Sequence, residues 1–98
     1  MFVVMLNYVK PLEEIDALIP EHVEYLKQNY AKGVFLASGR KIPRTGGVIL
    51  ARAKSLDALM DILHADPFHR EGVVEYGVTE FSATMVAEGL ELLKDAAV

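Results

Sequence analysis

The spacing of hydrophobic and polar positions changes several times along the chain, and each change predicts a new element. Phe2 to Val9 is rich in β-branched and aromatic residues and apolar on both faces, which predicts a strand covered on both sides. From Leu12 the apolar residues recur every three or four positions, which predicts an amphipathic helix. The residues of this stripe are Ile15, Ile19, Val23, Leu26 and Tyr30.

Two residues are expected to shape this first helix. The residue before a proline avoids the helical region, so Pro20 predicts a kink or a restart of the helix. Gly33 is well placed to end it, because glycine tolerates the left-handed backbone of a helix C-terminus. The next apolar run, Val34 to Ala37, predicts a buried strand that leads into Ser38 and Gly39.

The following segment, Arg40 to Gly47, has the composition of a hairpin connection. Pro43 and the Gly46-Gly47 pair are expected to supply its turn geometry. The run Val48 to Ala51 then predicts another short strand.

The second half of the chain repeats the alternation of helix and strand. Ser55 is a suitable N-cap for a helix whose apolar stripe ends near Ala65, and Val73 to Phe81 is mostly extended. The tail from Thr84 to Ala97 has a helical spacing of apolar residues, which Gly89 weakens. The stripe of the second helix comprises Leu56, Leu59, Met60 and Leu63, and that of the tail Val86, Leu90 and Leu93.

This order, strand, helix, strand, strand, helix, strand with an appended C-terminal helix, predicts an α+β chain with the ferredoxin-like βαββαβ fold. No internal repeat or linker interrupts it, so residues 1–98 are predicted to form a single domain. Both helices of such a domain cover one face of the sheet, and the apolar residues of the opposite face need another cover. Two sheets packed face to face would provide it.

Composition narrows the class of protein. A chain of 98 residues without cysteine has a small core and no disulfides, so a homodimer or higher homo-oligomer is expected. No apolar run is long enough to cross a membrane and the N-terminus lacks a basic leader, which favours a cytoplasmic protein. A net charge of −4 disfavours nucleic acid as a partner. No glycine-rich turn links a strand to a helix, so no nucleotide or other cofactor is predicted.

His22 and Asp66 are the candidate catalytic residues. His22 lies at the edge of the first helical stripe, where a solvated polar residue is not expected. If Asp66 accepts a hydrogen bond from one ring nitrogen, the other nitrogen is available as a general base. A start of the helix at Pro20 would add a dipole that opposes protonation of His22. The alternatives are a purely structural histidine-acid pair, and an Asp-Pro step that only ends the second helix.

Other polar or aromatic residues could line a substrate site. Ser38 could donate a hydrogen bond to a substrate oxygen, and Gly39 would let a ligand approach the backbone. Arg40, together with Arg44, could hold a carboxylate, whereas Phe68 and Tyr8 could wall the site or belong to the core.

A metal site made of His64, Asp66 and His69 is a weaker alternative, because this spacing matches no strong ligand motif. No metal is therefore predicted.

Three motifs together resemble the YciI-like (YCII-related) family: His22 within PEHVEYL, the Ser38-Gly39 pair, and Asp66-Pro67-Phe68 before Gly72. The resemblance in element order covers nearly the whole chain. It implies a dimeric α+β barrel of ferredoxin-like subunits, with a site in which His22 and Asp66 lie together. The chain departs from the family's usual pattern at Arg40, where a proline is common, and at the residues HREG after Phe68.

The resemblance also implies a kind of chemistry. A chlorohydroxyhydroquinone dehydrochlorinase resembles the family, as does the muconolactone isomerase fold. The first hypothesis is therefore a cofactor-free lyase or isomerase that moves a proton on a small cyclic or phenolic acid. The second is a non-catalytic module that binds or senses a small molecule in the same pocket, and the third is a purely structural role for the polar residues.

Overall fold

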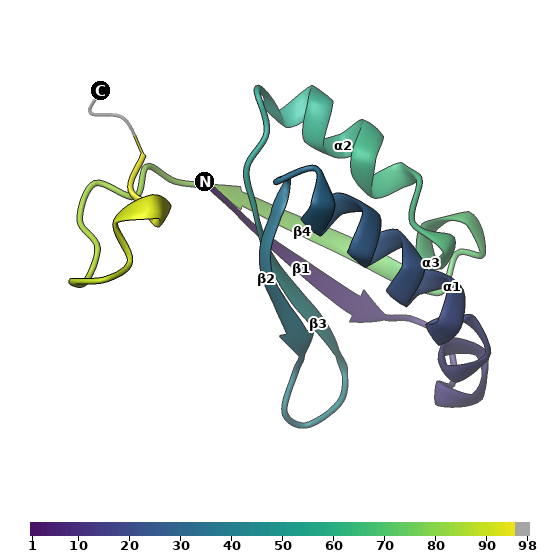
Figure 1. The fold of residues 1–98 in the computed structure, drawn as a ribbon. Coiled ribbons are helices and arrows are strands. Elements are labelled where there is room, and N and C mark those ends of the chain that lie inside the picture. Colours follow the sequence, from purple (N-terminus) through teal and green to yellow (C-terminus); the bar gives the residue numbers. More distant parts are fainter. Residues whose placement is uncertain (96–98) are drawn as a thin grey trace.

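A computed structural model describes residues 1–95 and has the predicted α+β architecture (Figure 1). Four strands form one antiparallel sheet in the order β2-β3-β1-β4. This is the ferredoxin-like order that the alternation of periods predicts, so the fold prediction is confirmed. The elements are β1 (Phe2–Tyr8), α1 (Leu12–Ala31), β2 (Phe35–Arg40), β3 (Gly46–Ala51), α2 (Leu56–His64), α3 (Pro67–Arg70), β4 (Val74–Glu80) and the 3-10 turn η1 (Glu91–Leu93).

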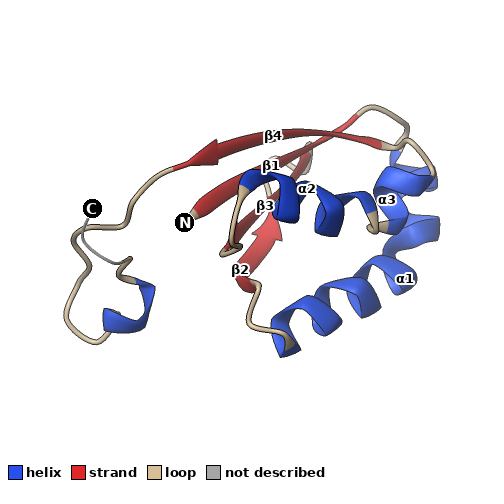
Figure 2. Cartoon of the chain, turned by 90° about the horizontal axis from the view of Figure 1, so that it is seen from above, coloured by secondary structure: helices blue, strands red, loops and turns tan. Residues whose placement is uncertain are grey.

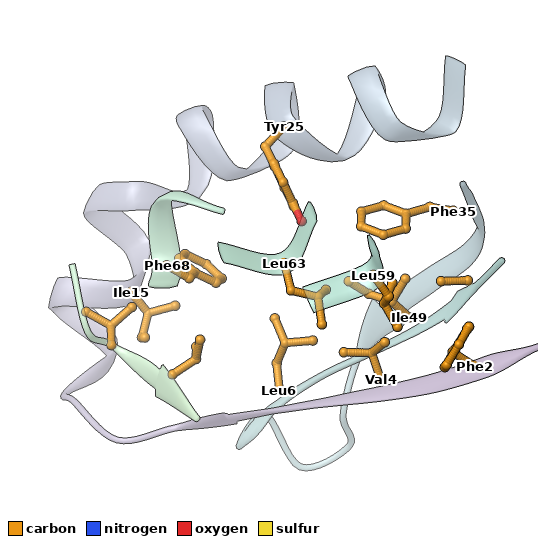
Figure 3. Close-up of a cluster of buried hydrophobic side chains, with 13 residues drawn as sticks. Phe2, Val4, Leu6, Ile15, Tyr25, Phe35, Ile49, Leu59, Leu63 and Phe68 are labelled. Carbon is orange, nitrogen blue, oxygen red and sulfur yellow. The ribbon is translucent and has the colours of Figure 1, made fainter. Parts of the chain in front are cut away.

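All three α-helices lie on the same face of the sheet, with the strands forming the second layer (Figure 2). The core fills the space between these layers, where Phe2, Val4 and Leu6 of β1 point toward the helices (Figure 3). Alternate residues of β1 are buried in this way, as a period of two requires. Phe68 and Leu63 meet them from the helical layer.

Helix α1 continues through Pro20, so the helix does not restart there, and the other predicted alternative, a kink, applies. Its first turns run in a different direction from the rest, which fits a kink at the proline (Figure 1). Because the helix begins at Leu12, His22 does not lie in a first turn, and the expected dipole effect on its protonation does not apply. Gly33 follows the helix with φ +74°, as predicted for a C-terminal stop.

The buried face of α1 is rotated relative to the predicted stripe. Val23 and Tyr30 are 37% and 38% exposed, whereas His22, Tyr25 and Asn29 are buried. Ile15, Ile19 and Leu26 of the predicted stripe do lie in or against the core. The apolar pattern missed His22 and Asn29 because they are polar. Both form hydrogen bonds, so their burial does not leave polar atoms unpaired.

The hairpin connection is shorter than expected, and its two glycines do not form the turn. Both belong to β3, where Gly46 pairs with Asn7 and Gly47 with Leu6. A Cβ at Gly46 would lie 1.8 Å from the Leu6 carbonyl oxygen, so close strand contact, not turn geometry, requires glycine here.

The predicted C-terminal helix from Thr84 to Ala97 is wrong for the described residues, which contain only the 3-10 turn η1; Ala96 and Ala97 lie outside them. Gly89 has φ +89°, a backbone incompatible with a helix. The segment lies beside the start of β1, away from the three α-helices (Figures 1 and 2). Arg52 and the Ala83 amide hold it through Asp95.

The sheet face opposite the helices is partly apolar. Val3 and Met5 of β1 face Leu50 and Val48 of β3 across this surface, and all four are only half-buried in the single chain. Among residues 1–95, no helix is both long and apolar enough to cross a membrane.

Candidate functional site

Helix α1 carries His22 into the interface between the helical layer and the sheet. The residue is 9% exposed, and its imidazole stacks on the ring of Phe68 with 3.9 Å between centroids and 9° between planes. Tyr25, one turn further along the helix, lies 6.1 Å from the same imidazole. These contacts hold the imidazole in one orientation.

Asp66 ends one helix and starts the next. Helix α2 ends at His64, as the Asp-Pro step predicts, but Asp66 then caps α3, a short helix that the sequence analysis did not predict. The Asp66 Oδ1 accepts a hydrogen bond from the Phe68 amide at 2.9 Å, and Pro67 occupies the first position of α3. The residue is 0% exposed, so its carboxylate depends entirely on protein donors.

The two residues meet although 44 positions separate them in the sequence. His22 Nδ1 lies 2.8 Å from Asp66 Oδ1, inside the interface. Because an ionised carboxylate only accepts hydrogen bonds, a neutral imidazole paired with one carries its proton on Nδ1 and has a free lone pair on Nε2. This arrangement orients a histidine for general base chemistry.

Tyr76 is a third member of this group that the sequence analysis missed. Its hydroxyl donates to Asp66 Oδ2 at 2.9 Å from strand β4. Burial, and then the Asp66 charge, raise the pKa of Tyr76 far above its ordinary value, which keeps the phenol protonated. The available signal was its position between Val74 and Val78, because a tyrosine on an inward strand face needs a partner for its hydroxyl.

A cavity of about 230 Å³ opens beside His22, between α1 and the strands β1, β2 and β3. It brings together every predicted substrate-binding residue: Tyr8, Ser38, Gly39, Arg40 and Phe68. Arg44 and apolar residues of α1 and the sheet complete its lining. These are Leu6, Ile19, Leu26, Val48 and Ile49, with Gly46 and Gly47 beside them.

The polar residues that line the cavity differ in whether another residue already binds their side chains. Ser38 Oγ lies 2.5 Å from the Tyr30 hydroxyl. Arg44 binds Asp16 and lies over the Tyr8 ring, 5.9 Å from its centroid. Arg40 forms no ion pair with any residue of the described range 1–95.

The three residues of the metal alternative do not converge. The rings of His64 and His69 stack with 4.4 Å between centroids, whereas the Asp66 carboxylate faces His22 and Tyr76. In the part of the chain that the structure describes, no three histidine, aspartate or glutamate side chains are grouped to hold a metal ion.

Comparisons with known proteins agree with this architecture. A family model described as the YCII-related domain matches residues 1–82. A sequence search of the curated proteins found no match.

One similar solved structure is that of 5-chloro-2-hydroxyhydroquinone dehydrochlorinase (TftG) from Burkholderia phenoliruptrix AC1100, in complex with 2,5-dihydroxybenzoquinone. The TM-score is 0.70 at 19% sequence identity, and the match covers 84% of this chain and 94% of that one. At this identity the likeness establishes a shared fold.

Proposed function

This chain belongs to the YCII-related family, and we propose that it is a small cofactor-free enzyme that moves a proton on a small cyclic or phenolic acid. His22 is the general base and Asp66 orients it. The observation that carries the proposal is the 2.8 Å contact between His22 Nδ1 and Asp66 Oδ1, made by an imidazole that also lines the cavity.

The chemistry needs no group beyond these two side chains. Nε2 of His22 takes a proton from a ring carbon or a phenolic oxygen, and the electron pair stays on the substrate. The adjacent Asp66 carboxylate stabilises the imidazolium. Return of the proton at another carbon completes an isomerisation, whereas departure of a leaving group with its bonding electrons completes an elimination.

The cavity favours a substrate with a single ring. An apolar cavity of about 150 Å³ can hold benzene, so about 230 Å³ accommodates one ring with a few substituents. Leu6, Ile19 and Leu26 supply apolar walls. Fused or multi-ring compounds are disfavoured because they need a larger volume than this cavity offers.

Two arginines at the cavity favour an acidic substrate. Asp16 already neutralises Arg44, so Arg40 is the better candidate to bind a carboxylate or phenolate. The solved neighbour supports a ligand of this type, because dihydroxybenzoquinone is a single ring with acidic hydroxyl groups. Ser38 can add a hydrogen bond to a ring oxygen.

We also propose a homodimer in which the sheet faces opposite the helices pack together. Val3, Met5, Val48 and Leu50 would be covered by the same residues of a second copy, which would bury the apolar area that the single chain leaves half-exposed. A cytoplasmic location and the assignment of residues 1–98 to one domain remain predictions.

The central test compares His22→Gln and Asp66→Asn with the parent protein, using chlorinated hydroquinones and small lactones as substrates. We expect His22→Gln to lower turnover by about 10²-fold or more, the usual contribution of a general base. His64→Gln is the matched control, because His64 is exposed, is absent from the cavity lining, and carries the same change.

Unchanged turnover in both the His22 and Asp66 variants, on a compound that the parent converts, would exclude the proposed roles. A bound compound recovered chemically intact, with no product from any substrate tested, would identify the protein as a binding module instead. Titration calorimetry with 2,5-dihydroxybenzoquinone supplies the binding measurement for this comparison.

A further inference from the structure

The Asp66 carboxylate has donors on both oxygens. Oδ1 is shared by His22 Nδ1 at 2.8 Å and the Phe68 amide at 2.9 Å. Oδ2 accepts from the Tyr76 hydroxyl at 2.9 Å, the single donor to that oxygen among residues 1–95. Helices α1 and α3 and strand β4 thus each supply one of the three donors.

We propose that Tyr76 is a positioning residue of this site, whose phenol holds the Asp66 carboxylate in its orientation toward His22. The inference rests on the proposed function and deepens it, because it assigns different roles to His22 and Asp66. Asp66 remains a fixed acceptor, and His22 is the member that exchanges protons with the cavity.

The physical argument starts from the burial of Asp66. A fully buried carboxylate oxygen without a donor carries a large desolvation cost. If the Tyr76 hydroxyl were absent, Asp66 would reduce this cost by turning away from its present orientation. This change weakens the acceptor for His22 Nδ1 and releases the tautomer that leaves Nε2 free.

Tyr76 is suited to act as a permanent donor. Burial and the neighbouring Asp66 charge raise its pKa well above the ordinary value, so the phenol stays protonated through neutral and alkaline pH. The Leu63 carbonyl, at 3.4 Å, is a poorer acceptor for the hydroxyl than the carboxylate at 2.9 Å. Tyr76 does not line the cavity and therefore acts through Asp66, not on a ligand.

The test is the variant Tyr76→Phe, which removes one oxygen and keeps the ring. Protein labelled with ¹⁵N-histidine is compared by long-range ¹H–¹⁵N NMR, which distinguishes the two imidazole tautomers. The chain has only three histidines, so His64→Gln and His69→Gln identify the His22 signals. Tyr25→Phe is the matched control, because its buried hydroxyl donates to the Ile62 carbonyl instead of to Asp66.

We expect the parent and Tyr25→Phe to hold His22 in the Nδ1–H tautomer, and Tyr76→Phe to mix both tautomers. On a compound that the parent converts, Tyr76→Phe should lower kcat about tenfold or more, the weight of a hydrogen bond to a charged group. KM should stay within about twofold, because Tyr76 does not line the cavity.

An unchanged His22 tautomer in Tyr76→Phe would overturn the inference, and so would an equal loss of tautomer order in Tyr25→Phe. These outcomes are separable from failure of the proposed function. If the tautomer responds to Tyr76→Phe while His22→Gln leaves turnover intact, Tyr76 positions the pair but the pair is not catalytic. If His22→Gln abolishes turnover while Tyr76→Phe changes neither tautomer nor kcat, the catalytic proposal stands and the role of Tyr76 is wrong.

Discussion

Replacement of Gly46 by alanine is predicted to break the contact between two central strands at the floor of the cavity. The added Cβ would lie 1.8 Å from the Leu6 carbonyl oxygen and 2.9 Å from its carbon. Real Cβ atoms essentially never approach another heavy atom closer than 3.0 Å, so β1 and β3 must separate locally by at least 1.2 Å. Both contacts are with backbone, which cannot rotate away as a side chain would.

The cost follows from the hydrogen bonds that this separation stretches. A strand bond of about 2.9 Å lengthened by more than 1 Å no longer meets hydrogen-bond geometry. The affected pairs, Leu6 with Gly47 and Asn7 with Gly46, lie in a partly buried part of the sheet. Two or three weakened bonds at about 1–2 kcal/mol each give a loss of about 2–6 kcal/mol. A small domain has about 5–15 kcal/mol in total.

Urea unfolding followed by circular dichroism measures this loss. Gly39→Ala is the control, because it lines the same cavity, lies on the neighbouring strand, and its added Cβ meets nothing within 4 Å. We expect the control to stay within about 1 kcal/mol of the parent. A Gly46→Ala protein that unfolds within the same margin would refute the reasoning, since the two strands would then have room that the structure does not give them.

Four further substitutions test the packing, the tail and the charge of the cavity. Phe68→Ala should lower the free energy of unfolding by about 3–5 kcal/mol, measured by urea titration, because a buried ring is lost from the core. Ser55→Ala should cost about 1 kcal/mol in the same assay, because its side chain caps α2 at the Ala58 amide. The Ala83 amide, followed by nearby cations, lowers the pKa of Asp95. The ionised carboxylate therefore stabilises the fold above the ordinary pKa of an aspartate, and this stability is lost as the pH falls through the lowered pKa. Thermal unfolding of Asp95→Asn should accordingly depend less on pH below about 4 than that of the parent. Arg40→Gln should weaken binding of a carboxylated ring about tenfold by calorimetry while a neutral hydroquinone binds as before, and an equal loss for both ligands would contradict an ionic role.

The elements of the fold could be predicted because their sequence periods are clear, and the errors have identifiable physical causes. A proline such as Pro20 can either kink a helix or end it, and both outcomes have the same sequence signal. The sequence therefore could not decide between a bend and a restart at this position. The glycines at 46 and 47 are needed by a neighbouring strand, and no local pattern reveals such a contact. The tail has helical spacing but no helical partner surface, and Gly89 takes a backbone that ends any helix.

The candidate site could be predicted in part, because a buried polar side chain needs a hydrogen-bond partner. A histidine at the edge of an apolar stripe requires a hydrogen-bond partner for its ring, and the Asp-Pro-Phe motif offers one near a helix end. The resemblance to the family was needed to pair them, because 44 residues separate the two positions. Tyr76 could not be linked to Asp66 in this way, since the pairing depends on how β4 packs against α3.

The site and the hydrophobic core share residues, which bears on how the pair could work. Phe68 is a core residue, the stacking partner of His22, and part of the cavity wall at once. The imidazole therefore cannot change its orientation without disturbing the packing of the helical layer on the sheet. Such a pair is preorganised by the fold, so its geometry should be the same before and after a ligand binds. Loss of activity in Phe68 variants should accordingly follow their loss of stability, whereas Tyr76→Phe should separate the two, because it changes the proton chemistry while the ring still fills its place.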